Sequence, residues 1–143
     1  MFDLILRPLK ERALAPVTRA IGRRVSPMTV TLAGFVAGIL AAVLVARGAY
    51  LPALTLWLVN RVLDGLDGSL ARARGSQTDF GGYADIILDF VVYAAIPIAL
   101  VIASPSVSLA LAALVLLASF YVNGASWMYL AALLERRDLG ARV

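Results

Sequence analysis

Four aspartates stand close together in an otherwise strongly apolar sequence, at positions 64, 67, 85 and 89. Asp64 and Asp67 are three residues apart and Asp85 and Asp89 are four apart, so each pair lies on one face of a helix. Carboxylate oxygens are the ligands that hard divalent cations prefer. The pattern therefore predicts a metal site, and paired metal ions in such a place suit phosphoryl-group chemistry.

The composition predicts an integral membrane protein. Of the 143 residues, 62% are hydrophobic and 15% are charged, whereas soluble domains are nearer half apolar and a quarter charged. The long apolar runs lack the alternation of barrel strands, so we expect an all-α bundle of membrane helices. The sequence has no cysteine and no histidine, which excludes thiolate and imidazole ligands and favours hard ions such as Mg²⁺, Mn²⁺ or Ca²⁺. We expect Mg²⁺ or Mn²⁺.

The apolar runs predict four transmembrane helices. We place them at residues 29–46, opened by Pro27, and at 50–74, 82–103 and 107–134, with a polar connection over 75–80. Residues 1–26 form a basic juxtamembrane segment, expected to lie on the membrane surface as an amphipathic element. Residues 27–134 then form the catalytic bundle, and 135–143 a charged cytoplasmic end. Gly34 and Gly38 make a small-residue pair, which we expect to support packing within the subunit.

The arginines predict the orientation. They gather before the first helix, at the end of the second and after the fourth, while Arg47 stands almost alone on the other side. Because cytoplasmic loops carry the excess of basic residues, the N-terminus is expected to be cytoplasmic, in an inner or plasma membrane. The net charge of +4 indicates an anionic lipid surface rather than a nucleic acid as its partner.

The helices predicted over 50–74 and 82–103 are antiparallel, so their acidic faces can meet at similar depth in the cytoplasmic half of the membrane. Each lipid-facing aspartate would cost about 2.5 to 3.5 kcal/mol, so all four must face inward. Structural salt bridges are one alternative, but Arg61 and Arg72 could neutralise two carboxylates at most. Bound divalent cations would neutralise the remaining charge. A cation channel is another alternative, disfavoured because the outer halves of the helices are apolar.

These positions carry a family resemblance. Asp64, Asp67, Gly68, Ala71 and Arg72, followed after eight residues by Gly81, Asp85 and Asp89, match all eight fixed positions of the CDP-alcohol phosphotransferase signature. The resemblance covers residues 26–134. It implies a membrane bundle with an N-terminal surface helix, usually of six transmembrane helices and often dimeric, of which four are seen here. A homodimer is therefore expected.

The resemblance also implies a reaction and a role for each residue. The reaction is transfer of a phosphatidyl-type group from a CDP-linked lipid to a small hydroxyl acceptor, with release of CMP, in phospholipid biosynthesis. By the family's pattern, Asp64 and Asp85 bridge two metal ions, Asp67 and Asp89 complete the two sites, and Asp89 also acts as the catalytic base. The residues assigned to the substrate are Thr31, Gly68, Ala71, Arg72, Thr78 and Gly81.

Two departures from the family pattern stand out. Met28 replaces the asparagine of the Pro-Asn-x-x-Thr element that leads into the first helix, which removes one polar contact to the CDP group. Four predicted spans stand where the family has six. A truncated, non-catalytic relative and a divalent-cation-binding membrane protein therefore remain alternatives to the enzyme. The sequence does not identify the acceptor alcohol.

Overall fold

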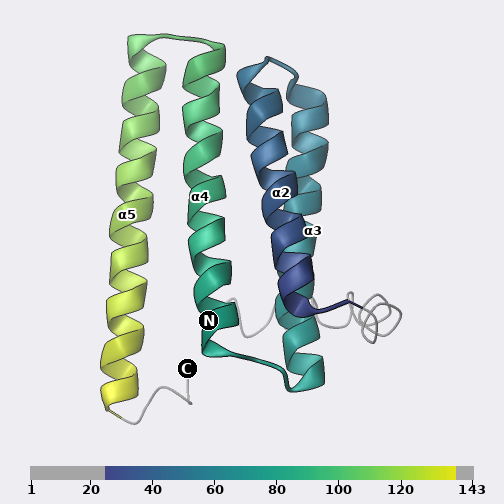
Figure 1. The fold of residues 1–143 in the computed structure, drawn as a ribbon. Coiled ribbons are helices and arrows are strands. Elements are labelled where there is room, and N and C mark those ends of the chain that lie inside the picture. Colours follow the sequence, from purple (N-terminus) through teal and green to yellow (C-terminus); the bar gives the residue numbers. More distant parts are fainter. Residues whose placement is uncertain (1–24, 138–143) are drawn as a thin grey trace. The chain divides into compact units, whose positions relative to one another are not determined.

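The computed structural model describes residues 25–137, which form four α-helices and no strand. The helices are α2 (Pro27–Ala46), α3 (Tyr50–Arg74), α4 (Asp79–Ala103) and α5 (Val107–Arg136) (Figure 1). The predicted all-α class is confirmed. The basic segment predicted to lie on the membrane surface falls outside the described residues up to position 24, and so do residues 138–143 of the charged end.

Polar side chains cap two helices, one of which begins at the expected Pro27 and the other earlier than the apolar pattern predicts. α2 begins at Pro27, where the Ser26 hydroxyl accepts a hydrogen bond from the Thr29 amide at 3.1 Å. α4 begins at Asp79 instead of residue 82, because the Thr78 hydroxyl accepts from the Gly81 amide at 3.0 Å. A side-chain cap satisfies an amide that has no partner within the helix. The predicted connection over 75–80 therefore shortens to 75–78.

Three helices within residues 25–137 are long and apolar enough to cross a membrane: α2, α4 and α5. This is a membrane protein, as the composition predicts. α3 has 25 residues, which is also sufficient length at 1.5 Å per residue. It is less apolar because it carries the first half of the acidic motif and ends in Arg72 and Arg74. Its crossing of the membrane stays a prediction.

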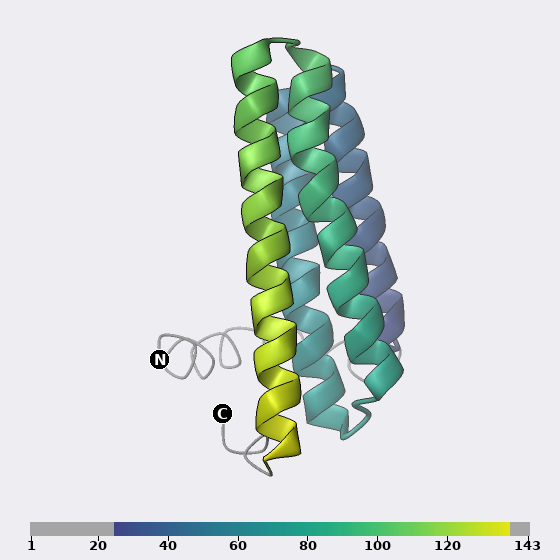
Figure 2. The same cartoon turned by 90° about the vertical axis from the view of Figure 1, so that its left-hand side faces the viewer.

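α2 is the helix that holds α3 and α4 together, since it packs against both (Figures 1 and 2). Small residues permit the close approach. A Cβ added to Gly34 would lie 3.3 Å from the Leu63 Cβ of α3, and one added to Gly38 would lie 2.7 Å from a Val92 methyl carbon of α4. The prediction that this glycine pair packs within the subunit is confirmed.

An apolar cluster next to the acidic residues fixes the register of α2 on α3. Val30, Leu66 and Leu70 are buried together there, with Val25 and Leu63 packed against them. Val30 and Leu66 immediately precede Thr31 and Asp67 in sequence. Burial of these side chains therefore sets the position at which the two polar residues meet.

Among the described residues, 104–137 form a unit separate from 25–103, and α5 is its helix. Its first turn is capped by the Ser106 hydroxyl, which accepts from the Leu109 amide at 3.2 Å. Gly124 is the one buried residue of the helix. The apolar side chains of α5 are thus largely exposed, as expected of a segment whose partners are lipid or other helices.

Candidate active site

Asp67 is the most deeply buried of the four predicted metal ligands, with 4% of its surface exposed. One carboxylate oxygen accepts a hydrogen bond from the Thr31 hydroxyl at 2.5 Å, and the other accepts from the Gly68 amide at 2.5 Å. Thr31 also donates toward the Pro27 carbonyl at 3.2 Å. The first turns of α2 are therefore tied directly to the acidic face of α3.

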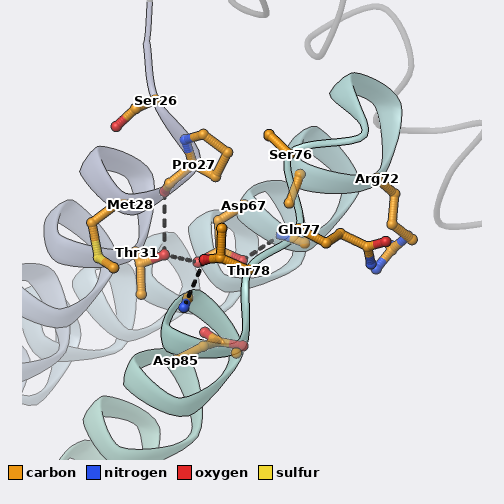
Figure 3. A pocket seen from close by; sticks show the side chains of 14 residues that line it. Ser26, Pro27, Met28, Thr31, Asp67, Arg72, Ser76, Gln77, Thr78 and Asp85 are labelled. Carbon is orange, nitrogen blue, oxygen red and sulfur yellow. Dashed lines mark hydrogen bonds between the residues drawn. The ribbon is translucent and has the colours of Figure 1, made fainter.

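A pocket of about 300 Å³ opens beside this pair, at the end of the bundle where the 75–78 connection lies (Figure 3). It is lined by Ser26, Pro27, Met28, Thr31, Asp67, Gly68, Ala71, Arg72, Ser76, Gln77, Thr78, Gly81, Gly82 and Asp85. All six residues predicted for the substrate are among them. The volume is at the lower end of the range for small-molecule sites. Their contact with a substrate stays a prediction.

The pocket combines a positive charge with small residues. A Cβ added to Gly68 would lie 3.2 Å from an Arg72 guanidinium nitrogen, so the arginine lies directly over this glycine. Arg72 also donates to the Ser69 hydroxyl at 3.4 Å. A Cβ added to Gly81 would lie 2.9 Å from the Thr78 hydroxyl. The absence of a side chain at Gly68 and Gly81 therefore leaves space that the Arg72 guanidinium and the Thr78 hydroxyl occupy.

All four predicted metal ligands line a second, much smaller cavity. Asp64 and Asp67 of α3 and Asp85 and Asp89 of α4 line it, together with Thr31 and other residues of α2. The cavity measures about 10 Å³, which is room for about one water-sized group. Asp67 and Asp85 line the larger pocket as well. The predicted convergence of the two acidic faces is therefore observed, with α2 as a third wall.

The donor set fits a hard divalent cation. Four carboxylates from two helices line a single small cavity, and oxygen donors are what Mg²⁺ and Mn²⁺ prefer. In the arrangement seen, no three acidic side chains within residues 25–137 are close enough to form a coordination cluster. Two of the four are engaged by an arginine instead, as described next. Their service as metal ligands stays a prediction.

Arg61, one helical turn before Asp64 on α3, pairs with two of the four aspartates. Its guanidinium lies 2.7 Å from one Asp89 oxygen and 3.6 Å from an Asp64 oxygen. The Tyr93 hydroxyl is 2.6 Å from the guanidinium and 3.0 Å from the second Asp89 oxygen. Asn60 accepts from Arg61 Nε at 2.8 Å and donates to the Gly34 carbonyl of α2 at 2.9 Å.

The sequence pattern indicated part of this network and not the rest. Arg61 was expected to be able to neutralise a carboxylate, and it does so. Tyr93 and Asn60 were not identified, although Tyr93 stands one helical turn after Asp89 and so shares its face. Asn60 gave no signal, because a polar residue at the edge of an apolar run is common in membrane helices. Ser76 and Gln77 of the pocket were also missed, since they sit in a connection without periodicity.

Comparison with known proteins gives a consistent result. Residues 24–141 match the model of the CDP-alcohol phosphatidyltransferase family. Inner membrane protein YnjF of Escherichia coli K12 is 41% identical over 140 residues, which are 97% of this chain and 67% of YnjF. The proteins named bifunctional IPC transferase and DIPP synthase of Thermococcus kodakarensis and Archaeoglobus fulgidus are each 34% identical over 85 residues, 59% of this chain.

The chain spans about two thirds of YnjF and less than a fifth of the two archaeal proteins, at 19% and 17% of their lengths. No solved structure gives a significant match. The family is a phosphotransferase family that acts on CDP-alcohols, is embedded in membranes and generally depends on a divalent metal. Since the family model covers most of the sequence and the signature residues line one site, the chain belongs to the CDP-alcohol phosphatidyltransferase family.

Proposed function

We propose that this protein transfers a phosphatidyl-type group from a CDP-linked lipid to the hydroxyl of a small acceptor, with release of CMP, in phospholipid biosynthesis. The observation that carries the proposal is the adjacency of two spaces. One is a pocket of about 300 Å³ lined by the six predicted substrate residues, and the other is a cavity lined by all four aspartates. Asp67 and Asp85 line both, so a diphosphate in the pocket would lie next to the carboxylates.

In the proposed reaction the acceptor oxygen forms a bond to the lipid-side phosphorus of the CDP-lipid. The anhydride P–O bond breaks and its electron pair leaves with CMP, while the acceptor proton passes to the Asp89 carboxylate. Two Mg²⁺ or Mn²⁺ ions, held by Asp64, Asp67, Asp85 and Asp89, would neutralise the charge of the diphosphate. The Arg72 guanidinium at the pocket wall adds a further positive charge toward the phosphates.

The remaining residues position these groups. Thr31 holds Asp67 through its 2.5 Å hydrogen bond, and Thr78 holds the first turn of α4 through its cap to Gly81. Gly68 and Gly81 keep side chains out of the pocket, where a nucleotide would lie against the helix backbones. Met28 lines the pocket with a thioether, which is a weaker hydrogen-bond partner than the amide at this position in the family pattern.

The proposal is tested by measuring CMP release. Purified protein in lipid nanodiscs would be given CDP-diacylglycerol, Mg²⁺ or Mn²⁺, and a panel of acceptors that includes glycerol phosphate, inositol phosphate and serine. We expect release with at least one acceptor, its loss in EDTA, and a fall of about a hundredfold or more in Asp89→Asn, since general-base catalysis typically contributes about 10²–10⁴-fold. Asp79→Asn is the matched control, because Asp79 is an exposed acid on the same helix outside the pocket.

No CMP release with any acceptor would refute the proposal, as would full activity of Asp89→Asn. Divalent-ion binding without CMP release would favour the cation-binding alternative or a non-catalytic relative. We further propose that the N-terminus is cytoplasmic and that the protein is a homodimer. Labelling of a cysteine introduced at Gln77, in the α3–α4 connection, tests the first from either side of the membrane, and cross-linking in native membranes tests the second.

A further inference from the structure

The guanidinium of Arg61 occupies the acidic cluster as a cation would. It lies 2.7 Å from Asp89 Oδ1 and 3.4 Å from Asp89 Oδ2, and 3.6 Å from Asp64 Oδ2. These two carboxylates come from different helices, α3 and α4, and both line the small cavity. Arg61 thus forms ion pairs with one aspartate of α3 and one of α4, and so links the two halves of the acidic motif.

The guanidinium is held in place by neutral groups of its surroundings. The Tyr93 ring centroid is 4.9 Å from its central carbon, and the Tyr93 hydroxyl is 2.6 Å from Nη1. Asn60, which is 2% exposed, accepts from Nε at 2.8 Å and is itself anchored to the backbone of α2. A fixed arginine geometry of this kind loses little side-chain entropy when it forms an ion pair.

We infer that Arg61 is a resident counterion of the carboxylate site, which holds Asp89 and Asp64 together without a divalent ion and competes with such an ion for them. The inference rests on the metal site of the proposed function. Both Asp89 oxygens are engaged, one by Arg61 at 2.7 Å and the other by Tyr93 at 3.0 Å. For Asp89 to coordinate an ion, at least one of these contacts must lengthen.

The electrostatics set the direction of the effect. Arg61 places a positive charge within ion-pair distance of two proposed ligands, and because these side chains are mostly buried its field on a divalent cation is less screened than in open water. Removing the charge should therefore strengthen ion binding while weakening the ion-free protein, because Asp89 and Asp64 would then lack their cation. A residue with a purely structural role would give the opposite sign for ion binding, since a loosened site binds less tightly.

The experiment measures Mn²⁺ affinity and stability on the same purified proteins. Binding is followed in detergent by the electron paramagnetic resonance signal of free Mn²⁺, and unfolding is followed by thermal scans in EDTA and in Mn²⁺. The variants are Arg61→Gln, the charge-conserving Arg61→Lys, and Tyr93→Phe, which removes only the hydroxyl. Arg47→Gln is the matched control. This exposed arginine follows the C-terminal end of α2, whereas Thr31, which lines the acidic cavity, lies near the N-terminal end.

We expect the Mn²⁺ dissociation constant of Arg61→Gln to fall about tenfold or more, given the weak screening at the site. Its unfolding midpoint should drop in EDTA and recover in Mn²⁺, so that the ion-induced rise exceeds that of the unaltered protein. Tyr93→Phe should shift affinity in the same direction by less, and Arg61→Lys should stay near the unaltered protein. Arg47→Gln should change neither quantity.

An unchanged or weaker Mn²⁺ affinity in both Arg61→Gln and Tyr93→Phe would overturn the inference. Absence of Mn²⁺ binding by every variant would overturn it together with the proposed metal site. If Arg61→Gln does not fold, the Mn²⁺ affinity of Tyr93→Phe is the test: tighter binding supports the inference, and unchanged or weaker binding overturns it. If the affinities shift as expected and no CMP is released with any acceptor, the counterion role stands and the proposed transferase activity fails.

Discussion

The contact between Gly38 of α2 and Val92 of α4 offers the sharpest test of how the site is supported. A Cβ added to Gly38 would lie 2.7 and 2.8 Å from the two Val92 methyl carbons and 3.2 Å from the Asn60 amide nitrogen. Val92 is fully buried, so it has little space into which to move. Gly38→Ala should therefore force α2 and α4 apart at this level.

The expected cost follows from two opposing effects. Overpacking a tight core costs about 1–3 kcal/mol, and alanine regains about 0.5–1 kcal/mol over glycine in a helix. The net destabilisation of Gly38→Ala should then be about 0–2.5 kcal/mol. In a Val92→Ala background both clashing methyl carbons are absent and the Asn60 amide nitrogen at 3.2 Å remains as a close neighbour, so the same glycine substitution should cost less.

The assay is a double-mutant cycle measured by unfolding in mixed detergent micelles. Trp57 of α3 and Trp127 of α5 are the two tryptophans of the sequence, so a Trp127→Phe background leaves a fluorescence signal from α3. Gly82→Ala is the control, because a Cβ there meets nothing within 4 Å. An equal cost of Gly38→Ala with and without Val92→Ala would refute the argument, since the clash would not be its cause.

Two further substitutions test the supports of the pocket. Thr31→Val keeps the shape of the side chain but removes the 2.5 Å hydrogen bond to Asp67. Because hydrogen bonds to charged groups are worth about 1.5–3 kcal/mol, we expect the free energy of unfolding in EDTA to fall by a similar amount. A fall below about 0.5 kcal/mol would contradict this expectation. Gly81→Ala places a Cβ 2.9 Å from the Thr78 hydroxyl, so we expect it to be less stable than Gly82→Ala by about 1 kcal/mol, the usual worth of a helix cap. The free energies of unfolding of Gly81→Ala and Gly82→Ala, measured side by side, test this. Equal values would show that the Thr78 cap can shift without cost.

Much of the site could be predicted from spacing within single helices. Asp64 and Asp67 share a face because they are three residues apart, and Asp85 and Asp89 because they are four apart. Because a carboxylate exposed to lipid is costly, both acidic faces are expected to point toward the interior of the bundle. These arguments require only a helix and an apolar surrounding, and both are plain in the sequence. The start of α4 was not predicted, since its cap Thr78 lies in a polar stretch where hydropathy gives no signal.

The third wall of the site was not predictable in this way. α2 carries no acidic residue, and its contribution depends on which of its faces meets α3 and α4. That choice is made by small residues and by Val30 packing on Leu66 and Leu70, which places Thr31 against Asp67. Apolar residues are found all around α2, so its own periodicity does not distinguish a buried face from a lipid-facing one.

The network around Arg61 shows why composition alone misjudges such a cluster. Counting charges suggests that four aspartates exceed what nearby arginines can neutralise, and this favours bound ions. The geometry adds that Arg61 already engages Asp89 and Asp64, which leaves Asp67 with the Thr31 and Gly68 donors. An ion entering the cavity therefore meets a site whose ligands are partly satisfied by the protein. Its affinity should depend on how tightly Tyr93 and Asn60 hold the arginine, and these residues belong to no part of the acidic signature.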